Sequence, residues 1–294
     1  MLNFALLAAR SPLSVAGPEA HSFLQGLVSN DVTQVAPGKA VYAALLTAQG
    51  KFLHDFFVSE LSGALVLDAE AARIDDLARR LKLYKLRAKV TIERLEGYVV
   101  AAIWGEGAEG ARVAIPGATP DPRLAAAGWR AILPEATARE TLAAAGLAEA
   151  NEDDYDRHRL ALGLPDGSRD MEVDKSVLLE CGFEELHGVD FAKGCYMGQE
   201  LTARTKYRGL VKKRLMPVVI GSGLMEGDAP PPGTPILLDG RDAGEMRSGS
   251  GTAGIALIRL DAFDKARLDG VPLMAGDTAL SAWTPDWMSL PEKE

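Results

Sequence analysis

The stretch FAKGCYMGQELTARTKYR, residues 191–208, gathers more unusual residue types than any other part of the chain. Gly194 and Gly198 within it indicate tight turns or a close approach of the backbone to a neighbouring segment. The residues that follow the cysteine suit a helix from position 196 or 197 onward. We therefore expect Cys195 to lie at or near a helix N-terminus.

That position of Cys195 favours a reactive or ligating thiolate. Unpaired N–H groups and the positive end of the helix dipole attract anions, and Lys193, two residues away, adds a positive charge. The alternative is a buried structural thiol, which is the commoner state of a single cysteine. From the crowding of the motif alone, the two interpretations have equal weight.

The same stretch leads into a basic run. Seven cations face one acid, Glu200, so seven minus one gives a local charge of +6 in a chain whose net charge is −9. Such a local reversal of sign indicates an anionic ligand, and the alternative is a solvated helix face and strand edge. The seven cations are Lys193, Arg204, Lys206, Arg208, Lys212, Lys213 and Arg214.

The segment KGCYMGQELTAR resembles the signature of the YgfZ family of folate-binding proteins. The family pattern, K-G-C-Y-x-G-Q-E followed by an arginine, is matched over residues 193–200 and at Arg204. Three further stretches fit the same family. They are FLQGLVSNDV (23–32), LLTAQGKFLHDFFV (45–58) and RLALGLPDG (159–167).

The resemblance implies a fold, a cofactor and a pathway. Mitochondrial relatives of the family are late-acting iron–sulfur cluster assembly factors, and the wider superfamily is that of the glycine-cleavage T-protein, a tetrahydrofolate-dependent aminomethyltransferase. The implied fold is α+β: a T-protein-like region of mixed sheets and helices, followed by a small C-terminal β-barrel. The implied cofactor is tetrahydrofolate.

The resemblance also implies site residues. Tyr42 falls where the T-protein has a folate-contacting tyrosine, and Asp55 matches the second of two acids there, with His54 in place of the first. Ala161 stands where the T-protein has an acid that reads the pterin, which weighs against the same substrate binding. The motif residues expected to contact folate or fix the loop are Lys193, Tyr196, Gln199, Glu200 and Arg204.

The composition fits a cytoplasmic protein of two domains. A chain of 294 residues, 47% hydrophobic and 25% charged, suits two globular domains, which we place at 1–210 and 211–294. The two cysteines, Cys181 and Cys195, form no C-x-x-C pair, so we expect no disulfide framework and no stable metal site. No apolar run approaches the length of a membrane span, and the start of the chain has no basic region typical of a signal peptide.

Hydrophobic periodicity predicts strands and helices without strict alternation, which is typical of α+β proteins. Polar residues 152–154 are interpreted as a helix start capped by Asn151, in preference to a metal site. The tail after Thr284 is expected to be loose. Predicted strands are 2–7, 12–15, 41–47, 52–59, 64–67, 88–95, 98–104, 111–115, 129–133, 213–220, 234–238, 252–259 and 271–283. Predicted helices begin at Pro18 and at 69, 137 and 152, the last three ending at 84, 147 and 162, and a long loop is expected over 221–235.

Three functions follow for testing. The favoured hypothesis is a non-enzymatic, tetrahydrofolate-binding accessory protein for iron–sulfur cluster assembly or repair, with Cys195 as a ligand shared with an assembly or client protein. The alternative is a folate-dependent one-carbon transferase or demethylase. A third class, an RNA-binding factor that uses the basic run, is disfavoured by the acidic chain, and we expect the family's link to tRNA modification to act through iron–sulfur enzymes.

Overall fold

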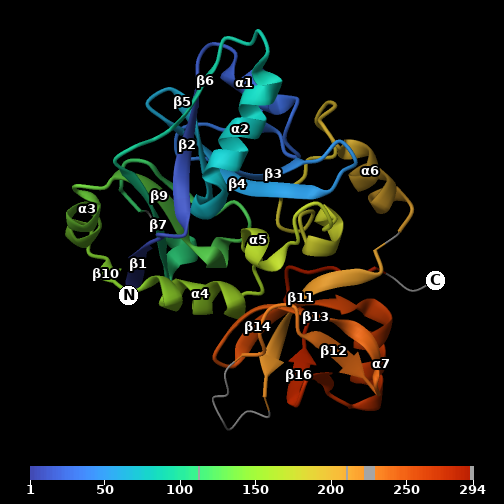
Figure 1. The fold of residues 1–294 in the computed structure, drawn as a ribbon. Helices are drawn as coiled ribbons and strands as arrows, with labels where there is room; N and C mark the ends of the chain where they lie inside the picture. The colour runs from blue at the N-terminus through green and yellow to red at the C-terminus, as the bar shows by residue number, and fades with distance from the viewer. Residues whose placement is uncertain (112, 210, 222–228, 292–294) are drawn as a thin grey trace. The chain divides into compact units, whose positions relative to one another are not determined.

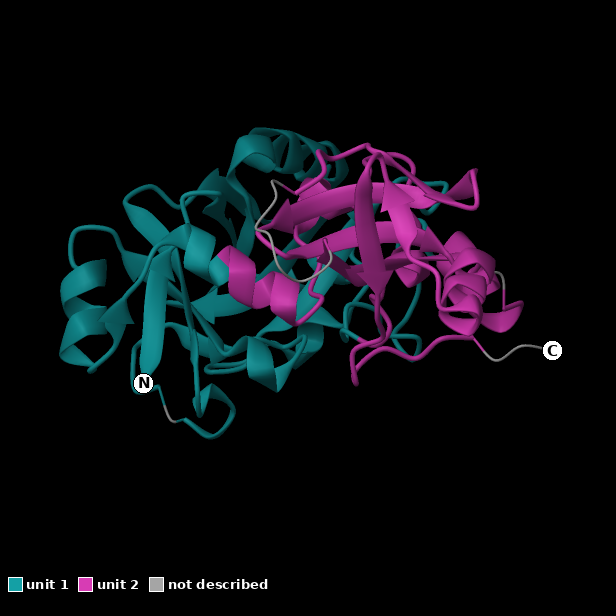
Figure 2. Ribbon diagram, turned by 90° about the horizontal axis from the view of Figure 1, so that it is seen from below, with its two compact units in different colours: residues 1–155, 186–199 teal, residues 156–185, 200–294 magenta. Residues whose placement is uncertain are grey.

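The computed structural model describes residues 1–111, 113–209, 211–221 and 229–291. The chain forms two compact units, shown in two colours in Figure 2. Unit 1 contains residues 1–155 and 186–199, and unit 2 contains residues 156–185 and 200–294. This division does not test the domain boundary expected between 210 and 211, which stays a prediction.

Unit 1 is built on two five-stranded sheets (Figure 1). One has the strand order β3-β4-β5-β2-β6 and the other β10-β1-β7-β9-β8. The strands of the first sheet are β2 (Arg10–Ala16), β3 (Val41–Leu46), β4 (Phe52–Leu61), β5 (Ala64–Glu70) and β6 (Thr91–Arg94). Those of the second are β1 (Leu2–Leu6), β7 (Tyr98–Gly105), β8 (Ala118–Pro120), β9 (Trp129–Pro134) and β10 (Ala148–Glu149).

The strand β3 and most of β4 are buried on both faces. This explains their nearly continuous apolar sequence, because a strand covered on both sides has no solvent face to alternate with. The two strands pair antiparallel, with Ala44 opposite Asp55 and Leu45 opposite His54. The predictions of strands at 41–47 and 52–59 are therefore confirmed.

The start of the helix at residue 152 is capped by polar and acidic side chains. Asn151 and Asp154 cap each other's backbone N–H groups at 2.8 and 3.2 Å, and Glu152 accepts bonds from the backbone of Ala8 and Ala9. The capping interpretation of this acidic cluster is confirmed. The helices are α1 (Ala20–Gln25), α2 (Ile74–Lys85) and α3 (Ala138–Ala144), with 3-10 turns at Val32–Gln34, Ala71–Arg73, Ala108–Gly110 and Ala125–Ala127. The helix α4 (Glu152–Ala161) begins in unit 1 and continues into unit 2.

Two predictions in unit 1 were wrong. The helix expected from residue 69 begins only at Ile74, because β5 continues to Glu70 in register with Arg10 of β2. The strand expected at 111–115 does not form over the described residues of that segment; residue 112 lies outside them. The short strand β8 pairs with β9 instead.

Unit 2 contains a closed six-stranded barrel with the strand order β11-β14-β13-β12-β15-β16. Its core is filled by aliphatic, methionine and phenylalanine side chains from the strands and from α7. The strands are β11 (Lys213–Ile220), β12 (Pro235–Leu238), β13 (Arg241–Ser250), β14 (Ala253–Arg259), β15 (Leu273–Ala275) and β16 (Thr278–Ala282). The helices are α5 (Gly167–Asp170), α6 (Gln199–Tyr207) and α7 (Leu260–Asp269), with a 3-10 turn at Leu178–Cys181.

The barrel was predicted, but not all of its parts. The strand β13 was missed because RDAGEMRSGS has few β-branched residues, and a register shift between Met246 and Ser248 breaks its alternation. The helix α7 was also missed, although Phe263 and Ala266 have helical spacing and Gly270 ends it in a left-handed conformation. The predicted loop over 221–235 lies partly outside the described residues.

The tail beyond residue 284 is not loose over its described part, so that prediction was wrong. Met288 is buried in the barrel core. The Trp287 indole N–H donates to the carbonyl oxygen of Leu162 at 2.8 Å. Both contacts lie within unit 2, where they fix the end of the barrel. Residues 292–294 lie outside the described part of the chain.

Candidate functional site: the cysteine loop of unit 1

The cysteine loop, residues 188–198, is attached to the segment that follows α1. The backbone N–H of Asp190 donates to the Ser29 carbonyl at 3.1 Å, and the Ser29 hydroxyl donates to Gly188 at 2.6 Å. The Asn30 amide donates to the carbonyl oxygens of both His187 and Tyr42. Asn30 is thus a structural residue, and the start of the loop is held by hydrogen bonds.

Lys193 is the central anchor of the loop. Its ammonium donates to three backbone carbonyls, those of Gln25 at 2.9 Å and of Val28 and Asn30 at 2.7 Å. An ammonium has three N–H donors, so these bonds use all of them. The ammonium also lies 5.1 Å from the centre of the Tyr196 ring. The positive charge that was expected to act on the cysteine is therefore used to hold the loop against the segment after α1.

Burial lowers the pKa of Lys193 from 10.5 to about 8, and the nearby acids Asp31 and Asp190 partly oppose this shift. A cation taken out of water is disfavoured unless it is well bonded. The three carbonyl oxygens provide those bonds but no full negative charge. Lys193 therefore holds its proton less firmly than an exposed lysine, while its ammonium form anchors the loop.

Gly198 brings the end of the loop against the β3–β4 turn. Its φ is +79°, and a Cβ at this position would overlap the Thr47 carbonyl oxygen and lie 2.9 Å from the Leu46 Cβ. The prediction of a close backbone approach is confirmed here. For Gly194 it is wrong, because a Cβ there would meet nothing within 4 Å and its φ is not positive.

Cys195 is exposed, whereas Cys181 is buried in unit 2. The helix α6 begins at Gln199, so the predicted helix start at 196 or 197 was wrong, and Cys195 lies four residues before the first helical residue. The left-handed Gly198 prevents the helix from starting earlier. Gln199 instead closes the loop, because its side-chain oxygen accepts the Tyr196 N–H at 3.0 Å.

The remaining motif residues differ in accessibility. Tyr196 is 9% exposed, and the Met197 N–H donates to the Gly26 carbonyl at 3.1 Å. Tyr196 therefore supports the loop from inside. Glu200 and Arg204 lie on the exposed side of α6, in unit 2.

The basic run is not a single cationic surface. Arg214 is buried and bonds to Glu185 at 2.8 Å, and Lys206 pairs with Glu184. Arg204 is exposed on α6, and Arg208 is exposed in the turn directly after it. Part of the run is thus consumed by ion pairs within unit 2, which weakens the case for a nucleic-acid surface.

Tyr42 and Asp55 meet inside the first sheet. The Tyr42 hydroxyl donates to the Asp55 carboxylate at 2.9 Å, and the two residues are 0% and 3% exposed. Burial and the adjacent carboxylate raise the pKa of Tyr42 well above its ordinary value. The Arg123 guanidinium lies 5.4 Å from the Tyr42 ring centre, and the Phe57 ring packs at 5.1 Å.

Sequence reasoning missed the buried charges around Phe57. Arg130, Arg123 and Arg10 lie 4.1, 4.7 and 5.7 Å from the centre of its ring. Asp68 pairs with Arg10 and Arg130, and Asp121 pairs with Arg123. The sequence did contain a signal of buried ion pairs. Arg130 lies inside the apolar strand sequence WRAIL, where a buried charge needs a partner of opposite charge.

Tyr42 and Asp55 do not fit direct contact with folate in this structure. Their polar groups are bonded to one another below the surface, and the Tyr42 ring is covered by Phe57 and Arg123. The Lys193 ammonium, expected to meet folate carboxylates, is bonded to three carbonyls. We therefore derive no reaction step through folate.

His54 is a structural residue. Its Nε2 lies 3.0 Å from Asp76, which also pairs with Arg79 and Arg80. Burial, with a contribution from Arg73, lowers the pKa of His54 to about 4. The imidazole is therefore neutral at physiological pH, and its N–H donates to the Asp76 carboxylate.

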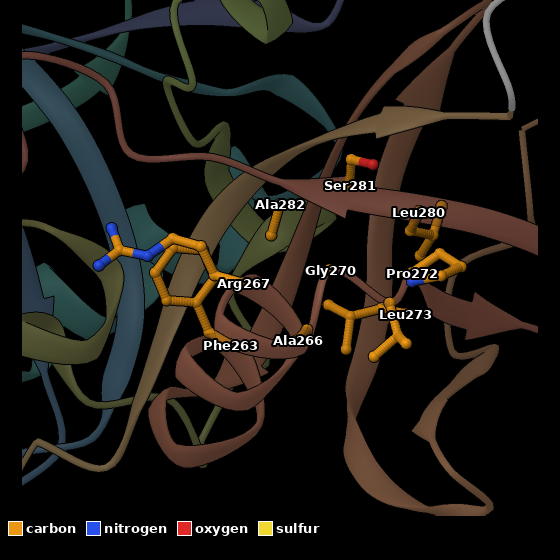
Figure 3. Close-up of a pocket in the computed structure, with 10 residues that line it drawn as sticks. Phe263, Ala266, Arg267, Gly270, Pro272, Leu273, Leu280, Ser281 and Ala282 are labelled. Atoms are coloured by element: carbon orange, nitrogen blue, oxygen red, sulfur yellow. The ribbon is translucent and has the colours of Figure 1, made fainter.

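The barrel carries a separate pocket of about 330 Å³ between α7 and the β15–β16 pair (Figure 3). The Arg267 guanidinium lies 6.0 Å from the Phe263 ring centre at one side, and Leu273 and Leu280 line the other. No residue predicted for the site lines this pocket. In the described part of the chain, no group of three or more His, Cys, Asp or Glu side chains is placed to hold a metal ion.

The fold defines the class of the protein. Residues 9–112 match the family described as the GCVT N-terminal domain, and residues 212–290 match the CAF17 C-terminal β-barrel domain. The structure is similar to that of glycine cleavage system aminomethyltransferase T from Bartonella henselae, with a TM-score of 0.75 over 98% of this chain and 86% of that one, at 17% identity. The chain is thus a T-protein-like α+β protein with a C-terminal six-stranded barrel.

Relatives narrow the class to a family. Human mitochondrial iron–sulfur cluster assembly factor IBA57 is 34% identical over 307 residues, which cover 96% of this chain and 84% of the relative. A homologue from Pyricularia oryzae is 32% identical, with 93% and 76% covered. The chain belongs to the IBA57/CAF17, or YgfZ-type, family of iron–sulfur cluster assembly factors. Among its described residues, no helix is both long and apolar enough to cross a membrane.

Proposed function

We propose that this assembly factor acts through Cys195, which ligates iron of a cluster held mainly by a partner protein. The supporting observation is an exposed thiol on a loop that Lys193 and Gly198 hold in place. A stable cluster generally needs about four protein ligands, mostly thiolates. One exposed cysteine supplies one of them, so the other ligands come from the partner.

The chemistry of this step is ligand exchange. The Cys195 thiol loses its proton to solvent, and the sulfur lone pair forms a bond to iron as a weaker ligand leaves. No electron is transferred. The exposed side chains of Glu200 and Arg204 are available to contact the partner, and Gln199 keeps the loop closed.

The test is complementation of a deletion strain. Cys195→Ser is expected to leave client iron–sulfur enzymes at the activity of the deletion strain, although the protein accumulates normally. Cys181→Ala is the matched control, because that cysteine is buried and has no access to a partner. Full activity with Cys195→Ser would refute the proposed role.

Tetrahydrofolate binding is the second part of the proposal. It is supported by the GCVT-type match over residues 9–112 and concerns binding only. The test is an anaerobic titration followed by the fluorescence of Trp104 and Trp129 in unit 1, with Tyr42→Phe beside the wild type. Lys193→Ala is a poor probe, because the change also removes the anchor of the loop.

Saturable quenching would support a folate site in unit 1. If Tyr42→Phe weakened it, the buried Tyr42–Asp55 bond would act by supporting the site from below, without touching folate. Absence of binding would refute the proposal of a folate site and would not affect the proposed role of Cys195. Formation of methylene-tetrahydrofolate from an aminomethyl donor would favour the one-carbon transferase alternative. The cytoplasmic location and the link to tRNA modification stay predictions.

A further inference from the structure

The α2 tip, residues 82–89, comprises the end of α2 and the segment that leads to β6, at the top of Figure 1. We propose that it docks an acidic, cluster-bearing partner protein next to the cysteine loop. This inference rests on the proposed function, since a chain with one exposed thiol needs a partner that holds the cluster. Three features of the tip carry it.

The first feature is an apolar surface. Leu83, Tyr84 and Leu86 are 64%, 44% and 88% exposed, although they lie within four consecutive positions. Single exposed apolar side chains are ordinary on a protein surface. Three such residues within four positions place an unusual amount of exposed apolar side chain at one helix end, where a partner protein can cover it.

The second feature is the backbone at Leu86. Its φ is +44° and its ψ is −108°, a conformation that residues with a side chain rarely adopt. A leucine that is both strained and almost fully exposed gains little from its own fold. Strain of this kind is concentrated at functional sites.

The third feature is charge. Residues 77–92 contain six cations and no acid. Arg79 and Arg80 pair with Asp76, and within the described part of the chain the other four make no ion pair. These four are Lys82, Lys85, Arg87 and Lys89. A chain of net charge −9 thus presents a basic, apolar tip, which is complementary to an acidic protein surface with an apolar recess.

The tip is ordered and connected to the cysteine loop. The Lys89 N–H donates to the Glu19 carboxylate at 3.0 Å, directly before α1. At the other end of α1, the Gly26 carbonyl accepts the Met197 N–H. A helix of six residues is about 9 Å long. The tip and the cysteine loop are therefore bonded to the two ends of the same short helix.

The first experiment places the photo-reactive residue p-benzoylphenylalanine at position 86 in living cells. The control position is Leu268, which is 87% exposed at the end of α7 and borders the acidic Asp269. Position 86 is expected to give one main cross-linked product with an acidic, cluster-bearing protein, and Lys82→Glu with Arg87→Glu is expected to abolish it. Labelling at 86 that does not exceed labelling at 268 would overturn the proposal.

The second experiment uses that cross-linked protein, purified in its cluster-bound form. Leu86→Gly is expected to weaken binding about tenfold while the melting temperature stays equal or rises, because glycine relieves the strained φ. If the substitution unfolded the tip, both the affinity for the partner and the melting temperature would fall. Unchanged affinity of Leu86→Gly and of the double charge reversal would refute the docking surface.

The same measurements separate this inference from the proposed function. Cys195→Ser is expected to bind the partner with wild-type affinity. The docking proposal and the proposed ligation by Cys195 can therefore be refuted separately. A cross-linked product of twice the chain mass would assign the tip to self-association. Co-sedimentation with phosphatidylserine vesicles that Leu86→Gly abolishes would assign it to a lipid surface. Either result would overturn the proposal.

Discussion

The Lys193 ammonium lies 2.7 Å from the carbonyl oxygen of Val28, so the lysine of the signature motif is bonded to the segment after α1. Two further carbonyls, of Gln25 and Asn30, complete its set of acceptors. The residue that appears in sequence as a cation beside a reactive cysteine is thus the anchor that determines where the cysteine is held. Its contribution to function is expected to act through the position of the loop.

Lys193→Met is expected to lower the free energy of unfolding of unit 1 by about 2 kcal/mol, because three half-buried carbonyls lose their donor. Hydrogen exchange of residues 188–199 is expected to accelerate with it. Peptide-resolved exchange and urea denaturation measure both effects. Lys39→Met is the matched control: the Lys39 ammonium makes one exposed bond to Gln34, so a change of less than about 0.5 kcal/mol is expected. Equal effects of the two variants would contradict the anchoring role.

Lys193 is also expected to titrate with a pKa of about 8 in the folded protein. Its ordinary value is 10.5, so between these two pH values the unfolded chain binds more protons than the folded one. By linkage, this group makes folding relatively more favourable as the pH rises through that window. NMR of reductively ¹³C-methylated protein gives the titration, and the Lys193→Arg variant identifies the signal. A midpoint above 10 would contradict the burial of this amine.

Gly198→Ala is expected to be strongly destabilising. The left-handed φ and the overlap of a Cβ with the Thr47 carbonyl act together, and about 2–4 kcal/mol of stability is lost. Gly194→Ala is the control within the same motif, because a Cβ there meets open space, and a change of less than about 0.5 kcal/mol is expected. Urea denaturation followed by tryptophan fluorescence compares the two. Comparable losses would mean that the loop is held differently.

The two cysteines are expected to differ in reactivity towards a thiol reagent. Cys195 is exposed, while Cys181 is buried and burial raises the pKa of its thiol. One thiol per folded chain is expected to react rapidly with dithionitrobenzoate, and the second only after denaturation. Cys195→Ser is expected to remove the rapid phase completely. Two rapid thiols in the native protein would contradict the placement of Cys181.

The sequence predicted the fold where local pattern and tertiary structure agree. The strands β3 and β4 are covered on both faces, and their nearly continuous apolar sequence is what a strand buried in this way requires. The strand β13 gave no such signal, because glycine, serine and charged residues fill it and a register shift breaks its alternation. The predicted start of α2 was also wrong. The pairing of β5 with β2 continues to Glu70 and outweighs the helix propensity of the residues from position 69.

The candidate site was predictable in its residues but not in their roles. The motif identified Cys195 and the loop around it. The partners of Lys193 lie more than 160 residues away in sequence, so no local pattern shows that its charge is already used. The closure of Tyr42 onto Asp55 likewise depends on the pairing of two strands. Long-range contacts thus decided which motif residues are accessible.

His54 makes the final prediction, which concerns acid stability. In the folded protein burial lowers its pKa from 6.5 to about 4, so the unfolded chain takes up a proton at higher pH than the folded chain. The free energy of unfolding is therefore expected to fall as the pH drops from 6.5 to 4, by at most about 3 kcal/mol from this residue. Above pH 6.5 the residue contributes no pH dependence.

The difference between wild type and His54→Gln isolates this effect, because the other three histidines are present in both proteins. Urea denaturation at pH values from 4 to 7.5 is expected to give curves that converge towards pH 4, where wild type loses the advantage of its neutral, buried imidazole. NMR titration of the His54 Cε1–H checks the folded pKa without reference to stability. A midpoint near 6.5, or two parallel curves, would show that His54 is accessible to water and that its bond to Asp76 does not keep it neutral.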